Sequence, residues 1–558
     1  VWSADLSGSA STFFPESGKW YWELRIDGAG TYPYIGITSQ EKVNDTVNGG
    51  TFYNIAWHAG GTSQGTGSSL GTITKENIPS FADDDIMSFA LDCDARKIWV
   101  AENNTYADSG DPENGSGENA SWTVDVGVSP VIMGYNGQGV GTIANFGQDD
   151  TFAGAISSAG NTDGNGKGVF KYAPPSGFLS LCTANLPEPT IGANSLTQAD
   201  DHFQTITYIG NGGTIVIPNA TSEPTTPSSM SFSPDFSWYK CRAGGSNRWN
   251  YLYDTSRGDG LALYTNLSYS ENQENVINAQ TFETNGTQIV RSSGDHLNND
   301  DDTYVAWNWK VNGGTVSNVS AGGSSNIRLI GGGTDDQASI QTNTDAGINI
   351  ISFENTVRAA DGFCTFPHGF DARPDMIWLK SRTSANYWAI NHISLDLKLG
   401  FLGTSSLADD AFVDSTFWNT INDTTVKFQS NGNLAAADED IIAYCFKGIE
   451  GYSKIGSYTG NGDANGSFVY LGFRPAFILL KCANNVSSWN ILDNIRDPVN
   501  PVSEYILPNS GDPAGSLVQA DFLSNGIKFR TTNAERNGTR VILYMAFAES
   551  PFKYANAR

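Results

Sequence analysis

The chain has 558 residues, more than a single hydrophobic core normally serves, which predicts roughly three to five domains. Its formal net charge of −27 argues against binding to nucleic acid or to an anionic membrane surface, because both need clustered Lys and Arg. No run of about 18 apolar residues occurs, so membrane insertion is not expected. Aromatic residues reach 12%, Gly is abundant and Met is scarce, a balance typical of short strands joined by tight turns. The composition therefore predicts an all-β protein.

Residues 1–182 contain short apolar segments separated by turn residues. The segment "DDDIMSFALDCDARKIWVAEN", residues 83–103, predicts a hairpin with Asp94-Ala95 at its bend. The other segments of this kind lie at residues 18–26, 32–38, 129–137 and 143–152. Together they predict one β-sandwich. The prolines in residues 183–199 are typical of an extended linker.

A second pattern begins after this linker and occurs three times. Each copy opens with an alternating apolar strand that ends in a lysine, and a tryptophan follows eight or nine residues later. The lysines are Lys240, Lys380 and Lys481, and the tryptophans are Trp249, Trp388 and Trp489. Each copy then carries a Phe-x-x-Asn-Gly hairpin signal, at residues 282–286, 428–432 and 522–526, and closes on a second apolar strand. Because four markers recur in the same order, three homologous domains are predicted.

These markers give the repeats approximate limits. We expect three tandem related β-sandwiches at residues 200–310, 350–448 and 449–558, one after another in an elongated protein. Residues 311–349 are rich in Gly, Ser and Thr and are interpreted as an insertion or a linker. The tryptophans occupy one equivalent position in three domains, which favours a buried core role over a role as sugar-stacking platforms.

Cysteine and histidine give little sign of chemistry. The six cysteines lie far apart, and most sit inside strand-like runs, which favours reduced cysteine in or near a core over disulfides. None of the five histidines belongs to a metal-binding or nucleophile motif; they are His58, His202, His296, His368 and His392. An enzyme is therefore not predicted.

Acidic clusters are the remaining source of chemistry, and each has a structural alternative. Residues 82–86, 298–303 and 437–441 place Asp or Glu directly before an apolar strand, where a tight turn favours them. We therefore interpret these clusters as turns rather than as the paired carboxylates of a glycosidase. The glycine-bent loops at 161–168 and 460–467 offer oxygen ligands for Ca²⁺, but neither completes an EF-hand, so no cofactor is predicted.

The segments "GKWYWE" and "KIWV", together with the later "NFGQ", resemble the SPRY domain, a concanavalin-like β-sandwich that serves as a protein-interaction module. The resemblance covers residues 15–155, with its segments in family order. It implies that partners bind through loops at one rim, where aromatic side chains contribute much of the interface energy. The candidate binding residues are Tyr53, Trp57, His58, Tyr106 and Tyr135.

The remainder, from "FKYAPPSGFLSLCTANLPEPTI" to the C-terminal "YMAFAESPFKYANAR", resembles the long β-rich tail-fibre and appendage proteins of marine bacteriophages. This resemblance implies a virion protein of the tail or another exposed appendage. Its partners would be other virion structural proteins and a bacterial surface receptor or glycan. It also implies a homo-oligomer, often a trimer, although neither heptads nor β-helix repeats enforce one. Such fibres usually have an N-terminal attachment segment, and none is visible in this sequence.

Three functions stay open at this point. The favoured one is a structural and adhesive protein of a tail fibre or appendage. A tail-borne polysaccharide depolymerase is the first alternative, and it requires two carboxylates about 5–10 Å apart in a groove. The second alternative is a capsid decoration or head-fibre protein without a receptor role.

Overall fold

The structure of the chain is a computed structural model. The residues that it describes are 6–27, 33–43, 54–65, 69–135, 141–192, 196–218, 230–243, 248–272, 280–291, 297–323, 325–357, 362–402, 413 and 415–554.

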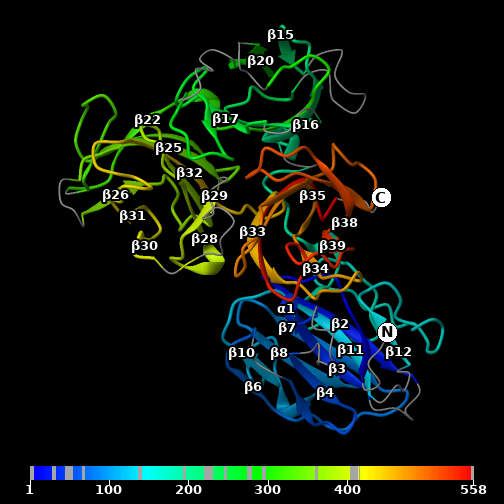
Figure 1. Cartoon of the computed structure of the whole chain (residues 1–558). Coiled ribbons are helices and arrows are strands. Elements are labelled where there is room, and N and C mark those ends of the chain that lie inside the picture. Colours follow the sequence, from blue (N-terminus) through cyan, green and yellow to red (C-terminus); the bar gives the residue numbers. More distant parts are fainter. Residues whose placement is uncertain are drawn as a thin grey trace. The chain divides into compact units, whose positions relative to one another are not determined.

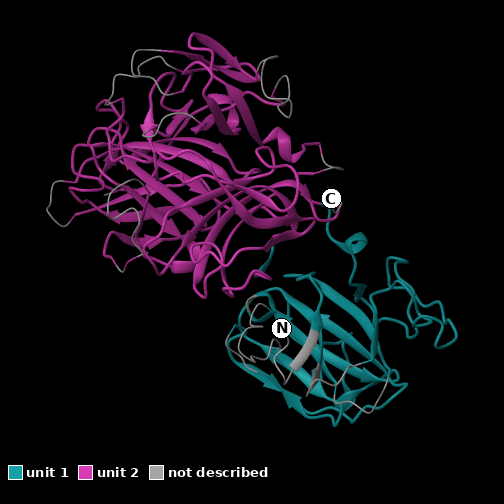
Figure 2. Cartoon of the chain, turned by 45° about the vertical axis from the view of Figure 1, so that its right-hand side comes forward, with its two compact units in different colours: residues 1–188, 467–470 teal, residues 189–466, 471–558 magenta. Residues whose placement is uncertain are grey.

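Two compact units make up the chain (Figure 2). Unit 1 comprises Val1–Glu188 together with Ser467–Tyr470, and unit 2 comprises Pro189–Gly466 and Leu471–Arg558. The division after Glu188 falls inside the predicted linker at 183–199. Unit 1 therefore contains the predicted first sandwich, and unit 2 contains all three repeats except for Ser467–Tyr470 of the third.

Two sheets form unit 1 (Figure 1). The first runs in the order β1 (Leu6–Ala10), β11 (Val128–Tyr135), β3 (Tyr34–Ser39), β4 (Ile55–His58) and β5 (Ser63–Gln64). The second runs in the order β12 (Thr142–Asn145), β2 (Lys19–Ile26), β7 (Ile86–Asp92), β8 (Lys97–Glu102), β10 (Ala120–Trp122) and β6 (Ile73–Lys75), with β13 (Leu179–Ser180) on β2 and β9 (Thr105–Tyr106) on β8. Unit 1 also includes β34 (Phe468–Tyr470), whose Tyr470 ring lies 6.3 Å from the ring of Phe13 between centroids.

The predicted strands of the first sandwich are present in unit 1. Strands β7 and β8 form the hairpin predicted around Asp94-Ala95, since they pair from Asp92 and Lys97 outward. Both strands bury side chains on their two faces, and Trp22 of β2 stacks on Phe89 with ring centroids 5.0 Å apart. Aromatic residues favour such pleated, buried positions, which is why the aromatic-rich segments became strands.

The first repeat is a sandwich of a larger and a smaller sheet. The larger sheet runs β14 (Phe203–Ile209), β21 (Thr303–Trp309), β16 (Phe236–Ala243), β17 (Tyr251–Asp254) and β18 (Leu263–Tyr264), and the smaller runs β15 (Thr214–Ile217), β20 (Gly286–Val290) and β19 (Gln280–Glu283). The predicted Asn-Gly hairpin is confirmed here, since Glu283 pairs with Gly286 and Asn285 has a positive φ of 57°.

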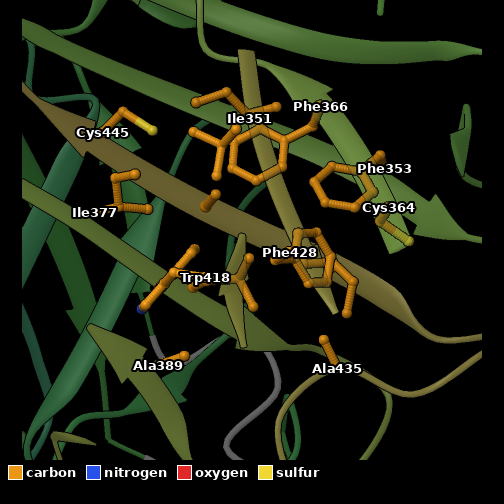
Figure 3. Close-up of a cluster of buried hydrophobic side chains, with 14 of the residues drawn as sticks. Ile351, Phe353, Cys364, Phe366, Ile377, Ala389, Trp418, Phe428, Ala435 and Cys445 are labelled. Carbon is orange, nitrogen blue, oxygen red and sulfur yellow. The ribbon is translucent and has the colours of Figure 1, made fainter. Parts of the chain in front are cut away.

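The second repeat has the same two-sheet plan with extra strands. Its larger sheet runs β22 (Ser317–Ser320), β24 (Gln337–Asn343), β25 (Ile348–Asn355), β32 (Asp440–Phe446), β27 (Met376–Ser381), β28 (Trp388–His392) and β29 (Gly400–Leu402), with β23 (Ile327–Arg328) on β25. Its smaller sheet runs β26 (Phe363–Pro367), β31 (Thr425–Gln429) and β30 (Trp418–Ile421). Figure 3 shows the core between these sheets, where Phe353, Phe366 and Phe428 pack together.

Residues 311–349 do not form a linker, so that part of the interpretation is wrong. They supply β22, β23 and β24, which extend the larger sheet of the second repeat. Gln341 of β24 is fully buried and donates to the backbone oxygen of Val311, and Asn343 Nδ2 donates to the oxygen of Lys310 at 2.8 Å. The segment is therefore a folded insertion that holds the second repeat against the end of the first.

The third repeat closes the series. Its larger sheet runs β33 (Ser453–Thr459), β40 (Val541–Pro551), β35 (Phe473–Cys482) and β36 (Asn490–Asp493), and its smaller sheet contains β39 (Gly526–Phe529), β38 (Gly515–Leu523) and β37 (Val502–Tyr505). The Asn-Gly hairpin is confirmed between β38 and β39, where Leu523 pairs with Gly526. In the second repeat the same signal ends β31 instead, and Asn431 makes only an isolated bridge to Ala435.

The three repeats surround a shared aromatic centre within unit 2, so the prediction of an elongated row is wrong for them. On the first repeat, Phe236 packs on Tyr444 and Trp238 packs on Trp378 of the second repeat, with ring centroids 4.9 and 5.4 Å apart. On the same face of that sheet, Trp307 is the cross-strand partner of Trp238 and packs on Phe477 of the third repeat, with ring centroids 5.8 Å apart. Each larger sheet therefore faces its own smaller sheet on one side and the neighbouring repeats on the other.

Helices contribute almost nothing to the described chain. They are α1 (Gln40–Val43) and five 3-10 turns at Ala107–Ser109, Thr183–Asn185, Ala199–Asp201, Asn312–Gly314 and Ile393–Leu395. In the described part of the chain, no helix has the length and apolarity needed to cross a membrane. The six cysteines are free and five of them are buried, in agreement with the predicted reduced state.

Candidate functional site

The repeated lysines have the same place in all three larger sheets. Lys240 pairs with Val305, Lys380 with Ile442 and Lys481 with Leu543, so each lies on the strand that borders the closing strand of its repeat. All three side chains are almost completely buried. Burial lowers the pKa of Lys240 to about 8 and that of Lys380 to about 7.

Backbone oxygens surround these lysine nitrogens. Lys380 Nζ donates to the oxygens of Asn386 at 2.7 Å and of Ser268 at 3.3 Å, and Ser268 belongs to the first repeat. Lys240 Nζ donates to the oxygen of Ser510 in the third repeat at 2.7 Å. Lys240 and Lys380 therefore join one repeat to another, whereas Lys481 Nζ donates to the oxygen of Ser487 in its own repeat. All three are buried and are not exposed to an external ligand.

The repeated tryptophans are equivalent in only two of the three repeats. The residue before each lysine pairs with Tyr251, Ala389 or Asn490 on the next strand. The residues directly before these partners are therefore equivalent, and they are Asn250, Trp388 and Trp489. Trp388 and Trp489 are buried, which confirms their predicted core role, whereas Trp249 is half-buried on the edge of its own core. The loop after Lys240 is longer, and this shifts Trp249 out of register.

The three equivalent side chains join successive repeats by the same kind of hydrogen bond. Trp388 Nε1 donates to the oxygen of Tyr264 and Trp489 Nε1 donates to the oxygen of Phe401, both at 2.8 Å. Asn250 Nδ2 donates to the oxygen of Pro508 at 2.7 Å. The second repeat therefore binds the first, the third binds the second and the first binds the third, which closes a ring. We call each of these contacts a seam.

Two seams also contain a buried ion pair. Arg257 Nε lies 2.6 Å from Asp254 Oδ2, and Tyr444 OH of the second repeat donates to the same oxygen at 2.7 Å. In the third repeat, Arg496 Nε lies 2.5 Å from Asp493 Oδ2, which accepts a hydrogen bond from Trp307 Nε1 at 3.1 Å. These carboxylates are engaged in joining repeats rather than directed into a cleft.

The acidic clusters form turns, in the way the structural interpretation predicts. In each cluster, the residue two positions before the following strand is an aspartate with a positive φ. These residues are Asp84, Asp301 and Asp438, with φ angles of 71°, 61° and 61°. Short polar side chains tolerate this conformation better than most residues. In the third cluster, Glu439 accepts from Asn386 Nδ2 at 3.0 Å and from the N–H of Ala436 at 2.8 Å.

The loop at 161–168 uses its carboxylate for hydrogen bonds from nitrogen. Asp163 Oδ1 accepts from the N–H groups of Asn165 and Lys167, and Oδ2 accepts from the N–H of Ser180 and from Asn185 Nδ2. Burial alone would raise the pKa of Asp163, but these donors hold it below its usual value. Within the described residues, no three His, Cys, Asp or Glu side chains are grouped to hold a metal ion.

Of the predicted rim residues in unit 1, Trp57 has its side chain in a core and Tyr106 is half-buried against another. Trp57 is fully buried and donates from Nε1 to the oxygen of Glu76 at 2.8 Å, so its assignment to a binding rim is wrong. Tyr106 lies on the other sheet and packs against the buried cluster of Tyr21 and Trp99. Burial raises the pKa of Tyr106. The structure therefore does not bring Tyr106 to the rim that holds His58.

His58, like Tyr106, is half-buried, and it lies on the first sheet of unit 1. It pairs with Tyr34 across β3 and β4, with ring centroids 5.1 Å apart. His58 Nδ1 accepts from the N–H of Gly60 at 3.1 Å, and burial lowers the pKa of the ring. Tyr53 and the side chain of Tyr135 lie outside the described residues.

A tight turn fixes the position of His58. Gly61 has a φ of +79°, and a Cβ atom there would lie 2.0 Å from the oxygen of Ile78, so only glycine is tolerated. The N–H of Gly61 donates to the oxygen of His58 at 2.7 Å. Sequence reasoning missed Tyr34, which is the first residue of β3 and is half-buried against Ala56, Val131 and Met133, whereas the other residues of β3 are buried.

The fold and these contacts define an all-β protein in which three fused sandwiches form one closed body. The model of one protein family matches residues 198–551, which is more than half of the chain and covers that body. The chain belongs to this family, which is described as a domain of unknown function, DUF7483. No curated protein matches the chain.

Proposed function

We propose that the chain is a structural protein of a bacteriophage tail fibre or another virion appendage, and that an SPRY-like unit 1 contacts the bacterial surface. The observation that supports this proposal is a difference between the units. In unit 2, the polar side chains common to the repeats join one repeat to the next. In unit 1, the cross-strand pair of Tyr34 and His58 has partly exposed rings.

The ligand of this pair would be a bacterial surface glycan or a receptor that presents an apolar face. Aromatic rings offer a large contact area with few rotatable bonds, so they supply much of the energy at such surfaces. The net charge of −27 repels an anionic polysaccharide at low salt, and salt screens that repulsion over about 10 Å at 0.1 M. Binding should therefore strengthen as salt rises. Assembly with other virion proteins, as a homo-oligomer, belongs to the same proposal.

Binding to immobilised polysaccharides tests the proposal. Labelled full-length protein is applied to lipopolysaccharides and capsular polysaccharides purified from a panel of marine bacteria. We expect retention on at least one of them and a loss of at least tenfold when Tyr34 and His58 are both replaced by Ala. The control is Val124→Ala, because Val124 is also in unit 1 and is 41% exposed. Equal retention of the double variant and the control would refute the role of the pair.

Two further readouts distinguish the alternatives. Release of new reducing ends from the retained polysaccharide would favour a depolymerase, which requires paired carboxylates. Gold-labelled antibody against the protein locates it on intact particles: label on the tail supports the proposal, and label confined to the head favours a decoration protein.

A further inference from the structure

The third seam replaces a buried ion pair with a histidine. Asp254 pairs with Phe236 and Asp493 pairs with Phe477, four residues before the repeated lysine in each case. In the second repeat, the residue that pairs with Met376 at this position is His392. Three residues further on, where the other repeats have Arg257 and Arg496, the second repeat has Leu395. The seam between the second and third repeats therefore lacks the Asp–Arg pair of the other two.

The imidazole of His392 bonds only to neutral backbone groups. Its Nδ1 lies 3.2 Å from the N–H of Ser394, which makes Nδ1 an acceptor. Nε2 consequently carries the hydrogen and donates to the oxygen of Tyr544 in the third repeat at 3.3 Å. The side chain is 1% exposed. Both ring nitrogens are thus matched to the neutral form of the ring.

The charged groups on the surrounding elements have other partners. Asp375 precedes β27 and pairs with Lys447 at 3.6 Å, and Asp396 follows the turn at Ile393–Leu395 and pairs with Arg373 at 3.4 Å. Lys454 lies on β33, which packs against that turn, and the phenol of Tyr544 lies on β40. None of these groups bonds to the imidazole. A positive charge on His392 would therefore have no carboxylate beside it.

We propose that protonation of His392 opens the seam between the second and third repeats, while the two seams with Asp–Arg pairs stay closed. A second proton must go to Nδ1, where it faces the N–H of Ser394 and removes that hydrogen bond. The ring would then be a buried cation without a counter-ion, which is strongly unfavourable. An Asp–Arg pair carries both charges already and needs no proton.

The sign of the pH dependence follows from burial. Burial lowers the pKa of His392 from 6.5 to about 4 in the folded chain. Between these values the unfolded or opened chain binds the proton and the closed chain does not, so closure weakens as pH falls from about 6.5 to about 4.

Two tryptophan indoles report on the seams separately. Trp489 Nε1 donates across the seam of His392, and Trp388 Nε1 donates across a seam that contains Asp254 and Arg257, both at 2.8 Å. We would measure hydrogen exchange of the two indole N–H groups by NMR of the full chain at pH 7 and pH 5. The ratio of the two rates cancels the intrinsic effect of pH on exchange. We expect the Trp489 rate, relative to that of Trp388, to rise at least tenfold on acidification.

Matched variants make the test decisive. His392→Gln keeps a donor and an acceptor but cannot take up a proton, and it should abolish the change in the ratio. His368→Gln is the control: His368 is also buried in the second repeat and contacts two backbone groups, at Phe370 and Asn422, but it lies away from the seam. If the ratio stays constant in the wild type, or rises equally in His392→Gln, the proposal is wrong.

Discussion

Glu23 in unit 1 and Asp254 in unit 2 are both fully buried carboxylates on strands, but they bond to different kinds of partner. Glu23 accepts from the N–H groups of Lys171 at 3.0 Å and Tyr172 at 2.8 Å, so it ties a long loop to its own sheet. Asp254 binds Arg257 within its repeat and Tyr444 in the next repeat. A buried polar group secures a loop in one case and joins domains in the other. Unit 2 should consequently unfold as one cooperative body, because its repeats share their buried charges.

The largest expected effect is the loss of a seam ion pair. Asp254→Ala removes the acceptor of Arg257 Nε and of Tyr444 OH in a buried seam, and Glu271, 2.9 Å from Arg257 Nη1, is the carboxylate that stays beside the guanidinium. We therefore expect about 3 kcal/mol less stability, at the low end of what breaking a buried pair costs. Urea unfolding followed by tryptophan fluorescence measures this loss. The control is Asp302→Ala, whose partner Arg248 is 22% exposed at the side chain, and it should cost at most about 1 kcal/mol. Equal losses in the two variants would contradict the role assigned to the seams.

The next largest effect concerns Glu23 in unit 1. Glu23→Ala leaves the N–H groups of Lys171 and Tyr172 without their acceptor, which should destabilise unit 1 by about 2–3 kcal/mol. We expect faster proteolysis within residues 146–172 and an unchanged unfolding transition of unit 2. If the unfolding transition of unit 2 moves as well, Glu23 does not act within unit 1 alone, and the contrast with Asp254 does not hold.

The pKa of Glu23 gives this comparison a pH dependence. Burial raises the pKa of Glu23, because it penalises the carboxylate, so the stability of unit 1 falls as pH rises through the folded-state pKa. Glu23→Gln should flatten that part of the stability profile of unit 1.

Lys380 should produce a pH dependence of the opposite sign in unit 2. Its pKa is about 7 in the folded chain against 10.5 for a free lysine, so between these values the unfolded chain binds the extra proton. Stability should therefore rise with pH across this range, by at most about 1.4 kcal/mol per pH unit. Lys380→Met removes the part of this gain that Lys380 supplies and leaves the smaller part that comes from Lys240, whose pKa in the folded chain is about 8. Denaturant midpoints at pH 7 and pH 9.5 measure it, and parallel shifts in the variant and wild type would show that Lys380 is not the group responsible.

The smallest effect separates the two kinds of tryptophan. Trp388→Phe removes the indole N–H that donates to the oxygen of Tyr264 in a buried seam, which should cost about 1–2 kcal/mol. Trp249→Phe should cost less, because that ring is only half-buried at the edge of its own core. Thermal unfolding of both variants tests this order, and the reverse order would overturn the register that makes Asn250 the equivalent of Trp388.

Local patterns predicted strands and turns well because short-range chemistry determines them. Asn285 and Gly286 tolerate the backbone of a tight hairpin, so the signal at 282–286 was sufficient. The insertion was harder, since β22 exposes all four of its residues at a sheet edge and its Ser and Asn resemble a linker. The same polar composition suits both structures.

The ring of repeats could not be read from alternation alone. The lysine strands were interpreted as period-two strands with one buried face, yet Met376 to Ser381 are buried without interruption. A continuous apolar run is the signature of a strand covered on both faces, and that signal was present in "MIWLK". The assignment of both Trp57 and His58 to the binding rim is wrong for a related reason. They are neighbours in sequence, but successive side chains of a strand point to opposite faces, so the two cannot share one surface.

The closed ring has a consequence for how the chain is synthesised. Phe203, on the first strand of the first repeat, stacks on Phe547 near the end of the third repeat, with ring centroids 5.3 Å apart. A nascent chain emerges from the ribosome in order, so the part of this aromatic face that packs on the third repeat, Phe203 included, stays uncovered until the last strand has been made. Truncated products would expose that face and aggregate, and binding by a chaperone during translation would protect it.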